Sequence, residues 1–160
     1  MVPSATPAAW VVYCDGSAVP NPGRMGLGAV LIAPDGVTQH RITEATTFTG
    51  CNNEAELRAL LRALDLLGQL LGQDKGAAPV QVYSDNSVLV AQLGTKATPP
   101  IARLAPLFDE ARRQLRGFGP VGLQWIPRQR NGAADALARA ALGLAPKTGV
   151  PHALRKKKRR

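Results

Sequence analysis

The order of apolar segments along the chain is the feature that most restricts its fold. Three segments with the composition of strands come first, at residues 10–14, 26–33 and 37–47. The sequence Pro-Asp-Gly at 34–36 is a hairpin turn signal, so the second and third segments predict an antiparallel pair. A long helix follows, because leucines then recur at helical spacing. These leucines are Leu57, Leu60, Leu61, Leu64, Leu67 and Leu71.

Strands and helices alternate in the second half of the chain. Residues 80–83 and 121–126 are short apolar segments that predict buried strands. Helices are expected at residues 86–93, 99–115 and 131–143. Three meander strands followed by this alternation predict an α/β fold. Its five-stranded mixed sheet would be antiparallel on one side, parallel on the other, and flanked by helices.

Polar residues and prolines predict where the helices begin. Asn52 and Asn131 precede helical patterns and are expected to cap them. Pro106 either kinks its helix or marks the true start. Residues 72–79 are expected to form a loop, and Trp125 is predicted to face the core from the last strand.

Four acidic residues lie at points where this fold brings its elements together. Asp15 and Asp85 each stand at the carboxyl end of an apolar segment in the parallel part of the sheet, where open α/β sheets bind ligands. Glu56 and Asp135 lie near the starts of two helices. Clustered carboxylates repel one another, and two magnesium ions about 4 Å apart would relieve that repulsion and promote phosphoryl displacement. The pattern therefore predicts a Mg²⁺ centre.

Charge is the main compositional signal. The chain of 160 residues carries a formal net charge of +9, but without the six consecutive basic residues at its C-terminus the charge is only +3. We expect residues 1–9 to be a disordered leader, 10–146 a single domain, and 147–160 a disordered basic tail. A tail of this kind contacts phosphates without reading sequence, and a merely solvated tail is the alternative. Its basic residues are Arg155, Lys156, Lys157, Lys158, Arg159 and Arg160.

Other chemistries find little support in the sequence. Cys14 and Cys51 fit a reducing cytoplasm, although a disulfide between them stays open. Neither these cysteines nor His40 and His152 have the spacing of zinc ligands. There is no Walker-type loop and no Gly-x-Ser-x-Gly motif, and no stretch reaches the roughly 18 apolar residues of a membrane span. A carboxylate-held metal in a basic protein instead indicates phosphodiester chemistry on a nucleic acid.

Four motifs surround the acidic residues in a fixed order. They are Asp15-Gly16-Ser17 with Asn21-Pro22-Gly23, Asn52-Asn53-Glu54-Ala55-Glu56-Leu57, Ser84-Asp85, and Trp125-Ile126-Pro127-Arg128 with Asn131 and Ala134-Asp135-Ala136-Leu137-Ala138. Over residues 10–142 this series resembles type I ribonuclease H. The resemblance implies an RNase H-like fold and hydrolysis of the RNA strand of RNA–DNA hybrids, with 5′-phosphate and 3′-hydroxyl ends. It also implies a catalytic quartet that binds two Mg²⁺ ions, or Mn²⁺ in their place: Asp15, Glu56, Asp85 and Asp135.

Substrate contacts also follow from the resemblance. The amides of Asn21, Asn52 and Asn53 match positions that touch the hybrid in its minor groove or at a DNA phosphate. Amides can bond the 2′-hydroxyl that distinguishes RNA from DNA. Gly16 and Ser17 would let the backbone approach the substrate closely. The substrate-binding candidates are Gly16, Ser17, Asn21, Asn52, Asn53, Arg128 and Asn131.

The sequence departs from the family in three ways that bear on activity. Many members carry a histidine before the last aspartate, whereas the loop at 127–130 has none and resembles a Pro-Arg-x-x-Asn subgroup. Arg128 would act there electrostatically, since an arginine cannot serve as a base. Cys51 takes the place of a hydroxyl that often binds phosphate. The segment between Asp85 and Trp125 is too short to contain the basic handle with which some members grip the hybrid. The basic tail would supply part of the affinity for the hybrid that is lost with this handle.

Two alternatives stay open at this point. One is a nuclease of the same fold that also cuts double-stranded RNA, and the other is a catalytically silent module that binds RNA–DNA hybrids. A silent binder would gain nothing from four mutually repelling carboxylates. We expect a cytoplasmic monomer with no membrane partner.

Overall fold

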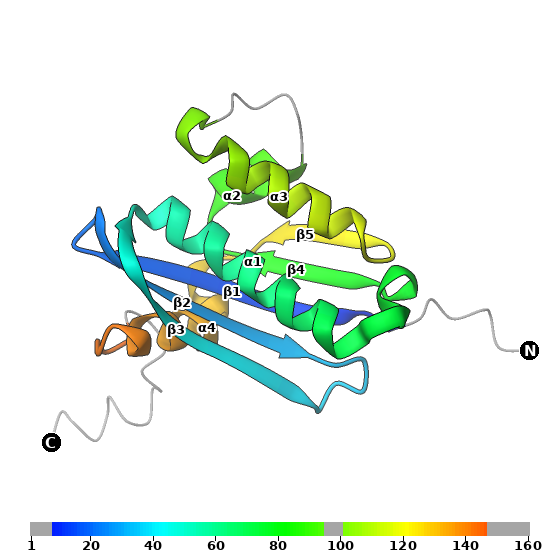
Figure 1. Ribbon diagram of the computed structural model, residues 1–160. Coiled ribbons are helices and arrows are strands. Elements are labelled where there is room, and N and C mark those ends of the chain that lie inside the picture. Colours follow the sequence, from blue (N-terminus) through cyan, green and yellow to red (C-terminus); the bar gives the residue numbers. More distant parts are fainter. Residues whose placement is uncertain (1–7, 95–100, 147–160) are drawn as a thin grey trace, which may run out of the picture.

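The structure is a computed structural model that describes residues 8–94 and 101–146. Five strands form one mixed sheet in the order β3-β2-β1-β4-β5 (Figure 1). The predicted leader lies almost entirely outside the described residues, and so does the basic tail at 147–160. The strands are β1 (Trp10–Val19), β2 (Gly23–Ile32), β3 (Gln39–Gly50), β4 (Val80–Ser84) and β5 (Val121–Trp125).

Strand directions confirm the predicted mixture. The β1–β2 and β2–β3 pairs are antiparallel, and the β1–β4 and β4–β5 pairs are parallel. The first two strands are longer than the predicted segments at 10–14 and 26–33, because β1 continues to Val19 and β2 begins at Gly23. Asp15 therefore lies inside β1 rather than after it.

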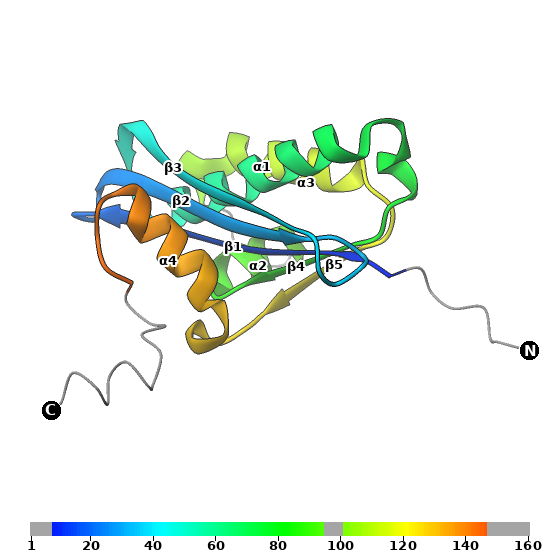
Figure 2. The same cartoon turned by 90° about the horizontal axis from the view of Figure 1, so that it is seen from below.

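Helices cover both faces of the sheet. Figure 2 shows α1 and α3 on one face and α4 on the other, against β1, β2 and β3. The apolar sides of α1 and α3 pack with the sheet into the main core, which includes Leu60, Leu64 and Phe108. The helices are α1 (Asn52–Leu71), α2 (Ser87–Gly94), α3 (Ala105–Arg116) and α4 (Gly132–Ala141), with 3₁₀ turns η1 (Gly72–Ala77), η2 (Ala102–Leu104) and η3 (Arg128–Asn131).

Several predicted helix ends need correction. The N-cap of α1 is Cys51, whose Sγ accepts a hydrogen bond from the Glu54 N–H, because Asn52 already has helical geometry and uses its side chain elsewhere. Asn131 stands at the N-cap position of α4 but makes no capping bond. Pro106 marks the start of α3 rather than a kink, and the loop expected at 72–79 contains η1.

Two glycines allow helices to approach the sheet closely. A Cβ at Gly28 of β2 would overlap the backbone of α4 at Ala134 and Ala138. A Cβ at Gly16 of β1 would overlap the backbone of α1 at Ala55. Both contacts are too close for any side chain. The absence of a Cβ at each position therefore allows the two helices to pack closely against the strands around Asp15.

Among the described helices, none has both the length and the apolarity that crossing a membrane requires.

Candidate active site

Strand register brings the two predicted strand-end aspartates together. β1 and β4 are adjacent and parallel, with Tyr13 opposite Tyr83. Two residues further along each chain, Asp15 and Asp85 therefore stand level with each other at the carboxyl end of the parallel pair. The sheet order confirms that both aspartates stand in the parallel part of the sheet, on neighbouring strands.

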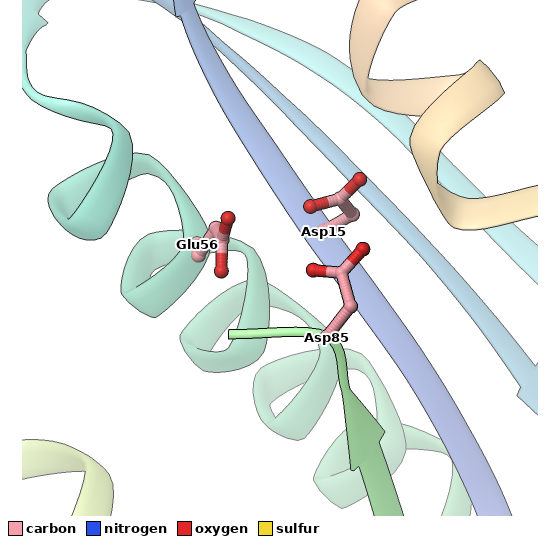
Figure 3. A group of neighbouring side chains, drawn as sticks. All are labelled: Asp15, Glu56 and Asp85. Carbon is pink, nitrogen blue, oxygen red and sulfur yellow. The ribbon is translucent and has the colours of Figure 1, made fainter. Parts of the chain in front are cut away.

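Glu56 reaches the same point from the first turns of α1. Figure 3 shows its side chain beside those of Asp15 and Asp85, which come from β1 and the end of β4. One carboxylate oxygen from each of these three residues lies within 4.8 Å of the others. Three oxygens from three different elements at this separation form a cluster that one cation can bridge.

Asp135 lies on the wall of the same small cavity. This cavity has a volume of about 80 Å³. Asp135 extends from the first turn of α4 and is buried, at 3% exposure. All four members of the predicted quartet thus border one cavity. Its lining residues are Asp15, Gly16, Ser17, Asn52, Glu56, Asp85, Arg128 and Asp135.

Burial and mutual repulsion suppress ionisation at the centre of the cluster. Burial first, and then the charges of Glu56, Asp85 and Asp135, raise the pKa of Asp15 to about 9, although the Gly16 N–H donates to its carboxylate at 2.9 Å. Burial also raises the pKa of Asp85, while a hydrogen bond from Asn131 and the charge of Arg128 act against that rise. Ionised carboxylates in this position need a compensating cation.

The donor set fits a hard divalent ion. Every side chain that could act as a ligand in the cluster offers carboxylate oxygen, the donor that Mg²⁺ and Mn²⁺ prefer. The neighbouring Cys14 thiol is buried, and burial together with the charges of Glu56, Asp15 and Asp85 raises its pKa far above the ordinary range. Cys14 therefore stays protonated and provides no thiolate. Both cysteines are free, so the disulfide that the sequence left open does not form.

Of the three asparagines predicted to contact substrate, only Asn52 is among the residues that line the cavity. The Asn52 Oδ1 accepts from the Ala18 N–H at 2.8 Å, and the Asn21 Oδ1 accepts from the Asn52 N–H at 3.1 Å. Asn53 Oδ1 accepts from the Asn86 side chain at 2.8 Å. These bonds join the β1–β2 turn and the end of β4 to the start of α1. Because each uses an amide oxygen, it orients the amide with its NH₂ group away from that partner.

Two residues near the cluster were not foreseen in these roles. Trp125 was predicted to be core, but it is 49% exposed, and its ring N–H donates to the Asp85 carbonyl at 3.1 Å. The prediction that Trp125 lies in the core was wrong. The alternation of side chains along a short edge strand does not show which of its residues are covered by a helix. Arg103 donates to Cys51 Sγ at 3.2 Å, a pairing across 52 residues that no local sequence signal indicates.

Comparison with known proteins shows which family this architecture represents. A family model described as "Reverse transcriptase-like" matches residues 13–141. A ribonuclease H of Pelobacter propionicus is 30% identical over 157 residues, which cover 88% of each chain. The chain belongs to the type I ribonuclease H family. Its sheet order and its helices on both faces are those expected for this family.

Solved structures of ribonucleases H share the fold. The N-terminal RNase H domain of Rv2228c from Mycobacterium tuberculosis is 32% identical, with a TM-score of 0.71 over 83% of this chain and 98% of that one. LC11-RNase H1, solved in complex with an RNA/DNA hybrid, is 29% identical, with a TM-score of 0.66 over 84% and 96% of the two chains. The full-length mycobacterial protein, named a bifunctional protein, is 30% identical over 143 residues, and the chain spans only 38% of its length.

Proposed function

We propose that this type I ribonuclease H is an endoribonuclease that hydrolyses the RNA strand of RNA–DNA hybrids with two divalent metal ions. The observation that carries the proposal is the oxygen cluster of Asp15, Glu56 and Asp85, with one oxygen from each within 4.8 Å of the others. It lies at the carboxyl end of parallel strands, where α/β sheets bind ligands. The fourth carboxylate, Asp135, borders the same cavity.

The four carboxylates would have different roles at the metal centre. All four carboxylates would hold the metal ions, with Glu56 serving one ion and contacting a 2′-hydroxyl, and Asp135 serving the other. Divalent ions at such a site activate a water and stabilise the leaving 3′-oxygen in an in-line displacement. The protein's contribution is to hold four acidic groups from four segments around one cavity before substrate arrives, so that little reorganisation is needed in the transition state. The expected products carry 5′-phosphate and 3′-hydroxyl ends.

Substrate recognition would use the asparagines of the β1–β2 turn and the start of α1. The amide oxygens of Asn21, Asn52 and Asn53 accept hydrogen bonds within the protein, so their NH₂ groups can donate to a substrate. The minor groove presents acceptors at purine N3 and pyrimidine O2, and it also displays the ribose 2′-hydroxyl. These donors therefore suit a minor-groove contact. The hybrid-bound LC11-RNase H1 structure supports the choice of substrate class.

Arg128 would act electrostatically on the carboxylates and the substrate phosphate, in the loop where many family members carry a histidine. It borders the cavity, and its charge acts to lower the pKa of Asp85. A guanidinium keeps its proton, so Arg128 can stabilise anionic phosphate but cannot take a proton from water. Arg103 beside Cys51 offers a cation where the family's phosphate-binding hydroxyl is absent.

A panel of four labelled 20-mers tests the proposal. RNA–DNA hybrid, double-stranded RNA, double-stranded DNA and single-stranded RNA are incubated with the protein in Mg²⁺, in Mn²⁺ and in EDTA. We expect the RNA of the hybrid alone to be cut, in either metal, and no cutting in EDTA. Cutting of double-stranded RNA as well would widen the substrate class. Tight hybrid binding without cutting in either metal would contradict the proposal and leave a silent binding module.

Other parts of the proposal remain predictions. They are a monomeric state, two Mg²⁺ ions with Mn²⁺ as substitute, and a cytoplasmic location, which two free cysteines support. The basic residues at 155–160 are proposed to add nonspecific phosphate contacts.

A further inference from the structure

Asn131 is a polar residue that is buried, although its position at the start of a helix does not require burial. Its side chain is 1% exposed, although it stands at the N-terminus of α4, where an asparagine ordinarily caps the helix. It makes no capping bond. The amide is therefore available for another task, and its partners indicate which.

The amide nitrogen of Asn131 serves two acceptors at the carboxylate cluster. Nδ2 donates to the carbonyl of Cys14 at 3.0 Å. The Asp85 carboxyl also accepts a hydrogen bond from the Asn131 side chain, and a carboxylate oxygen can pair only with the NH₂ group of the amide. A flipped amide would place its oxygen against two oxygens. The chemistry of the partners thus fixes the amide orientation.

These two bonds connect the strands that carry the central aspartates. Cys14 immediately precedes Asp15 in β1, and Asp85 follows β4. One amide from the start of α4 therefore ties the backbone at Asp15 to the side chain of Asp85. Asp135 extends from the same helix one turn later.

The oxygen of the Asn131 amide destabilises the fold, because it is buried without a partner in the part of the chain that the structure describes. Asn131 Oδ1 is buried and finds no hydrogen-bond donor among the residues that the structure describes. An apolar side chain of similar shape would fill the space without leaving a buried acceptor unpaired. The asparagine is thus better explained by its two donated bonds than by the stability of the fold.

We propose that Asn131 is a positioning residue, which holds Asp85 against β1 so that the carboxylates are placed for divalent metal ions. This inference depends on the metal-dependent function proposed above. It differs from the substrate contact that the family motif implied, because Asn131 is buried and is not among the residues that line the small cavity. Trp125 supports the same aspartate from the main-chain side, through its bond to the Asp85 carbonyl.

Calorimetric titration of Mg²⁺ into the full chain without nucleic acid tests the proposal. The variants are Asn131→Leu, which keeps the approximate shape of the side chain without its polar atoms, and Asn131→Ala. Leu115→Ala, in the buried face of α3 and remote from the cluster, is the control for general destabilisation. Circular dichroism establishes that each variant is folded.

We expect Mg²⁺ affinity to fall about tenfold in both Asn131 variants, as is typical when the partner of a metal ligand is lost. In Leu115→Ala the affinity should stay unchanged, and hybrid affinity in EDTA should be equal in all four proteins. Equal Mg²⁺ affinity in wild type and Asn131→Leu would overturn the inference while leaving the proposed function intact. An equal loss in Leu115→Ala would overturn it too, because the effect would then be one of stability. Absence of Mg²⁺ binding by wild type would contradict the proposed function and this inference together.

Discussion

Asp85→Asn is expected to abolish cleavage of the hybrid's RNA strand while leaving hybrid binding intact. Asp85 contributes one of the three oxygens of the cluster, and an amide at this position removes a negative charge that a cation needs. Loss of metal-ion stabilisation worth about 4 kcal/mol in the transition state corresponds to a decrease of about a thousandfold in rate. Binding should be equal or slightly tighter, because one carboxylate no longer repels the phosphates.

Single-turnover cleavage of a labelled hybrid measures this effect, and a gel-shift titration in EDTA measures binding. Asp109→Asn is the matched control, since Asp109 lies on α3 with a side chain that is 78% exposed and paired only with Arg112 at the surface. The control should cleave as wild type does. If Asp85→Asn kept more than about a tenth of the wild-type rate, the assignment of Asp85 to the metal centre would be wrong.

Asp15→Asn is expected to stabilise the metal-free protein, and increasingly so as the pH rises. In the folded chain the pKa of Asp15 is raised to about 9 by burial and by its acidic neighbours, against an ordinary value of 3.8. A raised pKa means that this carboxyl group supports folding fully below pH 3.8 and loses that contribution as the pH rises through about 9. Asparagine has no proton to lose, so the variant escapes the penalty.

The free energy of unfolding, from urea denaturation in EDTA between pH 5 and pH 8, checks this prediction. The advantage of Asp15→Asn should increase with pH by up to about 1.4 kcal/mol per unit, a gain of up to about 4 kcal/mol between pH 5 and pH 8. Mg²⁺ should stabilise the wild type more than the variant, because it binds the ionised cluster. A stability difference that stays constant across this pH range would show that Asp15 ionises normally in the fold.

Much of the fold followed from local sequence signals. Hairpin signals and the leucine repeat of α1 gave the correct element order, and parallel strands with helical crossovers implied the mixed sheet. The four carboxylates could be proposed as one group because strand ends and helix starts meet at one edge of such a sheet. The structure places three of them in one oxygen cluster, with Asp135 on the wall of the same cavity.

Tertiary contacts determine the features that local sequence signals did not predict, namely the cap of α1 and the environments of Asn131 and Trp125. Cys51 rather than Asn52 caps α1 because the Asn52 side chain binds the backbone of β1. Asn131 looked like a helix cap, but its donors are used by Cys14 and Asp85, which precede it by 117 and 46 positions. Trp125 is exposed because it ends an edge strand. Asn52, Asn131 and Trp125 thus each hydrogen-bond a partner that is distant in sequence.

Anomalous scattering from crystals soaked in Mn²⁺ would test the central claim, that the carboxylates form a divalent-metal centre. We expect a peak bound by oxygens of Asp15, Glu56 and Asp85, and its loss in crystals of Asp85→Asn. No peak at this cluster, with Mn²⁺ bound instead at exposed acids such as Asp65 or Glu44, would contradict it.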